Sequence, residues 1–204
     1  MPTVNFNFPD IQCGSPYLFT LSQPPATGTR LLVDANGNPT GAGSPFFMGS
    51  SEAPCTVHLS SKIELVQIDQ ETAPIDAIMT AEAAHIEMTL KESDLFKVNI
   101  ALAHSQYSSG TDSGLPPGAQ QYQMLTVGGL VTIPKYCIAL VAPRRGTANP
   151  SKNFVLCLYS AVATDPYQVN FTRTKETMYK VKFESLSIPT RNIGDHVCQY
   201  YRQL

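Results

Sequence analysis

The clearest pattern of hydrophobic and polar positions lies between residues 63 and 104. From Ala84 to Leu90 every second residue is apolar and the residues between are polar, which is the pattern of a strand with one buried face. An earlier strand is predicted from Ile63 to Ile68. Between the two, Asp69 to Glu82 is predicted to be a long acidic loop, because about 14 residues far exceed what a simple hairpin needs.

The hydrophobic period changes after the second of these strands. Apolar residues then fall on one face of a short helix, at Leu95, Phe96, Val98, Ile100 and Leu102. Ser93 can cap this helix, and Asp94 can interact favourably with its dipole. The pattern predicts a helix over about residues 93 to 104, with Leu95, Val98 and Leu102 packed on the sheet.

The C-terminal third of the chain predicts four more strands. They run from Met124 to Ile133, from Tyr136 to Ala142, from Phe154 to Ala163 and from Tyr179 to Ile188. In the last of these, alternation places Lys180, Lys182 and Glu184 on one face and Tyr179, Val181 and Phe183 on the other.

Two segments are rich in turn-forming residues. Residues 1–50 contain many Pro, Gly and Asn residues, with a turn at Asn36-Gly37, and are expected to form an arm or hairpin region. Residues 105–122 are expected to be a long polar loop without helix or strand. The prediction is therefore one mainly β domain over residues 1–204, a β-sandwich or partly rolled barrel with one helix and extended loops or arms.

The order of these elements resembles the major tail tube protein of long-tailed bacteriophages, a family related in fold to the tube protein of type VI secretion systems. In that family a Gly-containing turn leads into a strand, then into an acidic segment with a Pro, a second strand closed by an acidic residue, and a helix. The corresponding parts here are Phe46-Phe47-Met48-Gly49, Ile63 to Ile68, Asp69-Gln70, Ala73-Pro74-Ile75-Asp76, Ala84 to Leu90 and Glu92. Glu71-Thr72 depart from the family pattern, which often has a Gly there.

The resemblance implies a structural virion protein of the viral tail. Such a protein would form homohexameric rings that stack into a hollow tube, through which viral DNA passes non-specifically to the host. Its partners would be further copies of itself and the tape measure, tail tip and terminator proteins. It would be made and assembled in the host cytoplasm.

Charge is sparse and unevenly distributed along the chain. Charged residues make up 15% of the sequence, against a usual fraction of about 25%. Residues 1–129 carry four basic and twelve acidic residues, a net charge of −8, whereas residues 130–204 carry ten basic and four acidic residues, a net charge of +6. We predict a subunit interface between unlike surfaces, formed by Asp69, Glu71, Asp76 and Glu82 against Arg144, Arg145 and Lys152. The alternative is that the fold brings residues of the acidic and the basic part of the chain together on one surface, so that their charges are mixed.

Motifs for catalysis are missing from the sequence. There is no G-x-S-x-G elbow, phosphate-binding Gly-Lys loop or H-E-x-x-H helix, so no enzyme, catalytic residue or cofactor is predicted. Cys55 with His58 and His196 with Cys198 are close in sequence, but their spacings are weak for a structural zinc site, and no metal is predicted.

The remaining signals concern the cellular setting. The five cysteines are odd in number and widely spaced, and the residues after Met1 have neither the basic start nor the apolar run of a secretory signal. A reduced cytoplasmic protein is therefore expected. The apolar run from Phe154 to Ala163 has about half the length of a membrane helix, so no membrane segment is predicted. The overall acidic balance argues against specific nucleic-acid binding, despite the basic C-terminal region.

Two other classes of protein stay open. A tail terminator, connector or capsid-decorating protein would form a single ring or a discrete oligomer. A β-sandwich binding or adhesin domain would be a monomer or trimer with a ligand groove.

Overall fold

The computed structural model describes residues 15–51, 54–67, 73–91, 94–112, 120–143, 152–165 and 178–203. It is mainly β with a single described helix, which confirms the predicted fold class. The elements in chain order are β1 (Tyr17–Leu21), β2 (Leu32–Val33), β3 (Pro39–Thr40), β4 (Pro45–Ser50), β5 (Thr56–Val66), β6 (Asp76–Leu90), α1 (Leu95–Ala101), β7 (Ser105–Asp112), β8 (Gln120–Val127), β9 (Tyr136–Pro143), β10 (Asn153–Ala163), β11 (Tyr179–Ser185) and β12 (Cys198–Arg202).

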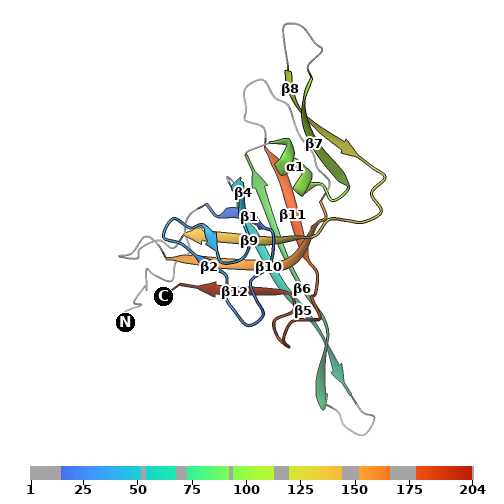
Figure 1. The fold of residues 1–204 in the computed structure, drawn as a ribbon. Coiled ribbons are helices and arrows are strands. Elements are labelled where there is room, and N and C mark those ends of the chain that lie inside the picture. Colours follow the sequence, from blue (N-terminus) through green and yellow to red (C-terminus); the bar gives the residue numbers. More distant parts are fainter. Residues whose placement is uncertain are drawn as a thin grey trace.

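One large antiparallel sheet forms the body of the molecule. Its strands follow the order β4-β1-β9-β10-β11-β6-β5, and β12 also pairs with β10. In Figure 1, β9 and β10 cross the direction of β6 and β11, so the two halves of the sheet fold over one another. A bridge between Ser51, just after β4, and Leu90, at the end of β6, joins the two halves across the roll. The sheet is therefore a partly rolled barrel.

Two hydrophobic clusters lie on opposite faces of β1, β9 and β10. Neighbouring residues along a strand point to opposite faces, so Leu18 and Ile138 belong to one cluster and Phe19 and Cys137 to the other. The first cluster lies inside the roll, where β6, β11 and α1 face these strands. The second is covered by the segment before β4, which contributes Leu31 and Ala42.

Most predicted strands of the body are found close to their expected positions. β9 and β10 match the predicted runs to within one residue, and β11 ends three residues early, at Ser185. The predicted alternation in β11 is confirmed, because Tyr179, Val181 and Phe183 are buried while Lys180 is exposed.

Residues 1–50 are not simply an arm. β1 and β4 are strands of the main sheet, because their apolar residues supply part of both clusters. The expected turn at Asn36-Gly37 does join the short strands β2 and β3, and Gly37 has the positive φ of 87° that this turn requires. Residues 1–14 lie outside the described part of the chain.

The helix is shorter than predicted. Its N-cap is Asp94, whose Oδ1 accepts a hydrogen bond from the Phe96 N–H, while Ser93 lies outside the described residues. Val98, Ile100 and Ala101 are buried, whereas Leu95 and Leu102 are only half-buried. Leu102 has an extended backbone that ends the helix.

The long polar loop predicted over residues 105–122 is wrong for residues 105–112 and 120–122, and residues 113–119 lie outside the described part of the chain. β7 and β8 occupy much of this segment and pair from Ser105 opposite Val127 to Asp112 opposite Gln120. Backbone hydrogen bonds between two polar strands stabilise this hairpin. Its side chains are mostly exposed, so the sequence lacks the hydrophobic pattern from which a strand is predicted. The predicted strand from 124 to 133 ends at Val127, because Gly128 and Gly129 adopt positive φ values of 109° and 75°.

Candidate subunit interface

The outer part of the β5–β6 hairpin, residues 59–66 and 76–83, leaves the body of the molecule and is here called the lower arm (Figure 1). β6 pairs with β11 only as far as His85, which lies opposite Glu184. Beyond that point β6 has β5 as its sole neighbour among the described strands. All the arm residues except Val66 are exposed, so this hairpin extends into solvent without a core of its own.

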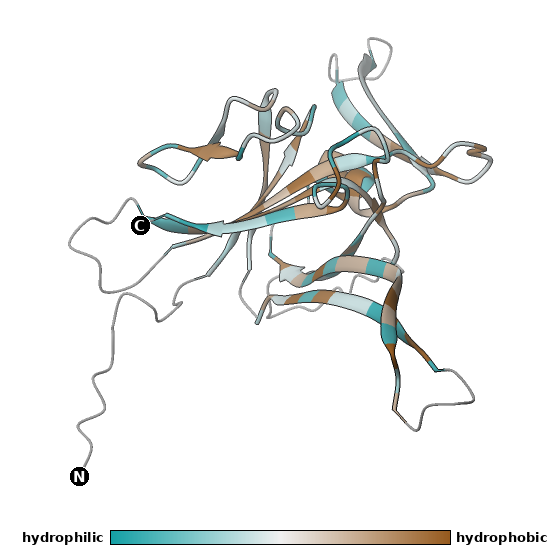
Figure 2. Ribbon diagram, turned by 90° about the horizontal axis from the view of Figure 1, so that it is seen from below, coloured by the Kyte–Doolittle hydropathy of each residue, from teal (hydrophilic) through white to brown (hydrophobic). Residues whose placement is uncertain are grey.

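The register of the hairpin sorts its side chains onto two faces. Directly paired residues share a face, so Leu59, Ile63, Leu65 and Met79 continue the face that β6 buries through Ala84 and Ile86. These four side chains are 52%, 55%, 65% and 53% exposed. The opposite face carries Lys62 and Glu64, which form an exposed ion pair at 2.9 Å. Figure 2 shows the resulting alternation of hydrophobic and hydrophilic residues along both strands.

A β-bulge interrupts the lower arm. Lys62 pairs with Ala81 and the next residue, Ile63, pairs with Met79, so Thr80 is an extra residue of β6 without a partner across the ladder. The Thr80 hydroxyl donates to the Lys62 carbonyl oxygen at 3.3 Å, which ties the bulge to the opposite strand.

A shallow groove of about 360 Å³ lies where the lower arm meets the segment before β12. Leu59 and Met79 of the arm, with Val197, give it apolar walls, and Glu82 and His196 add polar groups. The apolar surface of the arm is thus continuous with a depression in the body.

The β7–β8 hairpin leaves the opposite end of the molecule and is here called the upper arm (Figure 1). Its two strands contain one charged residue, Asp112, and its side chains include the exposed Tyr122, Met124 and Val127. Its base is fixed by aromatic contacts, since the Phe96 ring of α1 packs edge-on against Tyr107 of β7, with centroids 5.3 Å apart.

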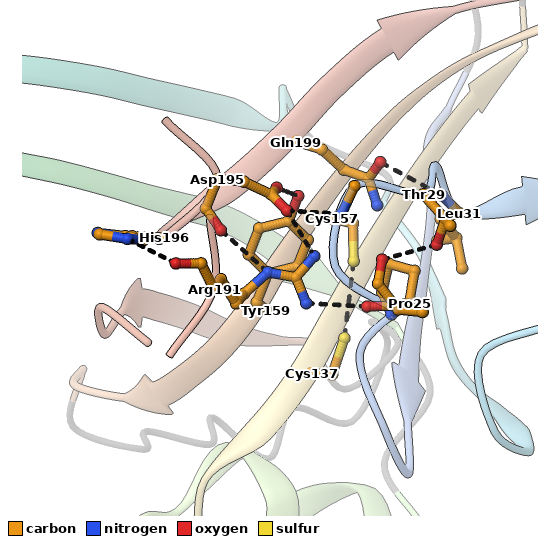
Figure 3. Close-up of polar contacts among 12 residues, drawn as sticks. Pro25, Thr29, Leu31, Cys137, Cys157, Tyr159, Arg191, Asp195, His196 and Gln199 are labelled. Carbon is orange, nitrogen blue, oxygen red and sulfur yellow. Dashed lines mark hydrogen bonds and ion pairs between the residues drawn. The ribbon is translucent and has the colours of Figure 1, made fainter. Parts of the chain in front are cut away.

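Two loops also expose large apolar side chains. Val131, in the loop after the upper arm, and Ile193, before β12, are each 98% exposed. The second loop is rigidly held (Figure 3): Arg191 donates to the Pro25 carbonyl oxygen at 2.8 Å, to the Asp195 carbonyl oxygen at 2.9 Å and to Asp195 Oδ2 at 2.9 Å. Single exposed apolar side chains are common on protein surfaces, so these two do not by themselves mark an interface.

A charged cluster lies at the root of the lower arm on its polar side. Glu87 is 3.3 Å from Lys180 and 3.8 Å from Lys182, and Lys180 also contacts Asp165 at 3.3 Å. The hydrogen bond from Lys180 holds the pKa of Glu87 below its usual value. Lys180 and Lys182 of β11 are therefore paired with carboxylates of their own chain.

The structure places three of the seven predicted interface residues. Asp76 begins β6 near the tip of the lower arm, and Glu82 lines the groove at its base. The acidic loop predicted over Asp69 to Glu82 is wrong from Asp76 onward, because those residues pair with β5. Lys152 immediately precedes β10, at the end of that strand away from β11.

The other four predicted residues, Asp69, Glu71, Arg144 and Arg145, lie outside the described part of the chain. Within one chain Lys152 and the lower arm lie at different ends of the sheet, so a contact between them would have to join two copies. That contact stays a prediction.

The apolar residues of the lower arm were missed in the sequence. Val57, Leu59, Ile63 and Leu65 fall at every second position but for Ser61, which is a strand signal that was available. No pattern within one strand shows that such a face is left uncovered, because burial depends on the rest of the fold.

The described cysteines and histidines do not form a metal site. Among the residues that the structure describes, no group of three or more His, Cys, Asp or Glu side chains is arranged to hold a metal ion. The thiols of Cys137 and Cys157 lie 3.6 Å apart in the buried sheet, and burial raises the pKa of Cys55 to about 11.

In the part of the chain that the structure describes, no helix has the length and apolar character needed to cross a membrane.

No protein-family model and no curated protein matches the sequence.

Proposed function

We propose that this chain is a structural subunit that assembles with copies of itself, through its two arms, into stacked rings forming a hollow tube. By its resemblance to the major tail tube protein of long-tailed phages, the tube would belong to a virion tail and conduct viral DNA to the host. The observation that carries the proposal is the lower arm, an amphipathic hairpin whose apolar face is open to solvent.

Exposed apolar area of this extent favours a protein partner. Leu59, Ile63, Leu65 and Met79 are each more than half exposed along one face. The Ser61–Glu82 pair lies between Leu59 and the other three on this face, but monomeric proteins rarely leave so many large apolar side chains exposed side by side. A second subunit would bury it, which stabilises association by about 25 cal/mol for each Å² of apolar surface removed from water.

The positions of the arms support an open-ended assembly. The lower and upper arms leave opposite ends of the molecule (Figure 1). If the lower arm of one copy contacts a different surface of the next, the contact is heterologous, and its repetition gives rings or filaments rather than a closed dimer.

The strand edges support the same proposal. In the described part of the chain, the outer edge of β5 has no neighbouring strand over eleven residues, and β7 and β8 pair only with each other. Exposed edges without Pro or bulges invite further pairing, and β8 contains neither a Pro nor a charged residue. Pairing between subunits would use these edges.

Electron microscopy of the purified protein tests the proposal. We expect tubes of constant diameter at high protein concentration or after addition of a tail-tip initiator. The double substitution Ile63→Glu with Leu65→Glu should abolish the tubes, whereas the control Lys62→Gln with Glu64→Gln, on the opposite face of the same strand, should retain them.

Other outcomes separate the remaining classes of protein. One discrete oligomer under all conditions would instead support a terminator, connector or capsid-decorating role. A monomer or trimer that never polymerises, even with initiator, would contradict the proposal and favour a binding or adhesin domain.

A further inference from the structure

The root of the lower arm contains a pair of stacked histidines. His58 of β5 and His85 of β6 are directly opposite one another, with ring centroids 4.3 Å apart and an angle of 22° between the planes. His85 is also the last residue of β6 that pairs with β11. The stack therefore lies at the point where the hairpin loses the support of the sheet.

The groups facing this pair carry a small negative excess. From its own strand His58 has the uncharged neighbours Thr56 and Ser60 on the same face. The charged groups around the pair are Glu87 of β6, 3.7 Å from the His85 ring nitrogen, Lys180, Lys182 and Glu184 of β11, and Asp165, which is bound to Lys180. Three carboxylates against two ammonium groups leave one net negative charge when both imidazoles are neutral.

The charges around the pair would balance one added proton but not two. Protonation of His85 would balance the cluster and place the new charge beside Glu87. Protonation of His58 as well would put two cations face to face at the stacking distance, with no further carboxylate to offset them. Separation of the rings relieves this repulsion, so acid favours the separated state.

We propose that the His58–His85 stack is an acid-sensitive hinge, which holds β5 and β6 together at the root of the lower arm at neutral pH and lets the two strands of the arm separate when both imidazoles are protonated. Imidazole side chains change charge between about pH 5 and pH 8, so the transition belongs to that range. Separation of the arm strands leaves the folded body intact, because the clusters of the main sheet do not include either histidine.

Hydrogen exchange on the full-length, unassembled chain tests the hinge. Protection factors, corrected for the pH dependence of intrinsic exchange, are measured by NMR for the backbone amides of β5 and β6 at pH 7.5 and pH 5.0. We expect the arm amides of wild type to lose about tenfold in protection at pH 5.0, because separated strands no longer protect their ladder amides from exchange. Amides of β9 and β10 should keep their protection.

Two variants separate the hinge from general acid effects. His58→Phe with His85→Phe keeps an aromatic pair that takes up no proton, and should abolish the loss. His58→Phe alone leaves a single imidazole beside Glu87 and should also abolish the loss. This single variant replaces the double variant in the test if the double variant does not fold. The control His104→Gln alters an exposed histidine outside the arm and should behave as wild type.

Either of two results would overturn the hinge: arm protection that is independent of pH in wild type, or an equal loss in the phenylalanine variants. Because the measurement uses unassembled protein, its result is independent of whether the proposed tube forms.

Discussion

Arg191 and Asp195 form an ion pair, 2.9 Å between Nη2 and Oδ2, that closes the loop before β12. The Arg191 side chain is buried, and its guanidinium carbon lies 3.7 Å from the centroid of the Tyr159 ring. Asp195 also accepts hydrogen bonds from the Tyr159 hydroxyl and the Gly28 N–H. Through these contacts one pair of residues fixes two loops, 25–28 and 191–195, to the main sheet.

Replacement of this arginine should destabilise the fold. Arg191→Leu removes the cation from a partly buried carboxylate and the donor from the Pro25 carbonyl oxygen, and we expect a loss of about 3 kcal/mol in the free energy of unfolding. Urea denaturation measures the change. The control Arg30→Leu, at an exposed arginine 5.9 Å from the Tyr201 ring centroid, should cost less than about 1 kcal/mol. Equal losses in the two variants would contradict a special role for Arg191.

Asp195 should also make stability depend on pH in acid. Burial acts to raise the pKa of this carboxyl group, but hydrogen bonds from Tyr159, Gly28 and Arg191 outweigh it and hold the pKa below the unfolded value of 3.8. A group with a lowered folded pKa contributes stability that is present above its unfolded pKa and lost as the pH falls through the folded value. We therefore expect the free energy of unfolding to decline below about pH 4, as measured by urea denaturation at stepped pH.

The matched variant for this dependence is Asp195→Asn. It should be less stable than wild type at pH 7 and should show a shallower decline between pH 4 and pH 2, where wild type loses this contribution. A decline as steep as that of wild type would assign the acid sensitivity to other carboxylates.

The packing of α1 gives a graded prediction. Ile100 is 3% exposed within the main cluster, whereas Leu95 is half-buried. Ile100→Ala should lower the free energy of unfolding by about 2 to 5 kcal/mol, since it leaves a cavity in the roll. Leu95→Ala should cost less than half as much. Thermal unfolding of the two variants gives the comparison, and an unchanged melting temperature for Ile100→Ala would exclude the packing described.

The predicted acidic interface can be tested by removing its charges. Replacing Asp69, Glu71 and Asp76 together by Asn or Gln should slow tube growth and leave the monomer folded, because contacts with a basic surface of a neighbouring copy would be weakened. Each exposed pair contributes only about 0.2 to 1 kcal/mol, but the contacts recur around every ring. Light scattering at low salt follows the growth rate. Growth at the wild-type rate would remove these residues from the interface.

Strands with a buried face were predictable from the sequence. In β10, which buries both faces, and in residues 84–90 of β6, which bury one, burial itself produces the hydrophobic pattern that identifies the strand. The outer half of β6 and both strands of the upper arm are exposed, so only pairing with another strand defines them. A local hydrophobic pattern does not show which segments of the chain will pair.

The candidate site was harder to predict for the same reason. Asp76 and Glu82 were predicted on an intersubunit loop, whereas both lie on β6, and their part in an interface stays a prediction. Ile63 and Met79 were overlooked because the pattern of a strand does not reveal whether its apolar face is covered. The contacts of Arg191 with Pro25 and Tyr159 join distant parts of the chain and left no signal in the local sequence.

The bulge at Thr80 makes the curvature of the lower arm depend on one residue. A bulge bends its strand and increases the local twist, whereas an uninterrupted ladder is straighter. Deleting Thr80 would place Ala81 and Met79 next to one another in β6, opposite Lys62 and Ile63, which are already their partners. Every pair would keep its face, but the arm would point in a different direction. In an assembly built through this arm, chain length at a single position would then set the angle between neighbouring subunits, and with it the diameter at which a ring can close.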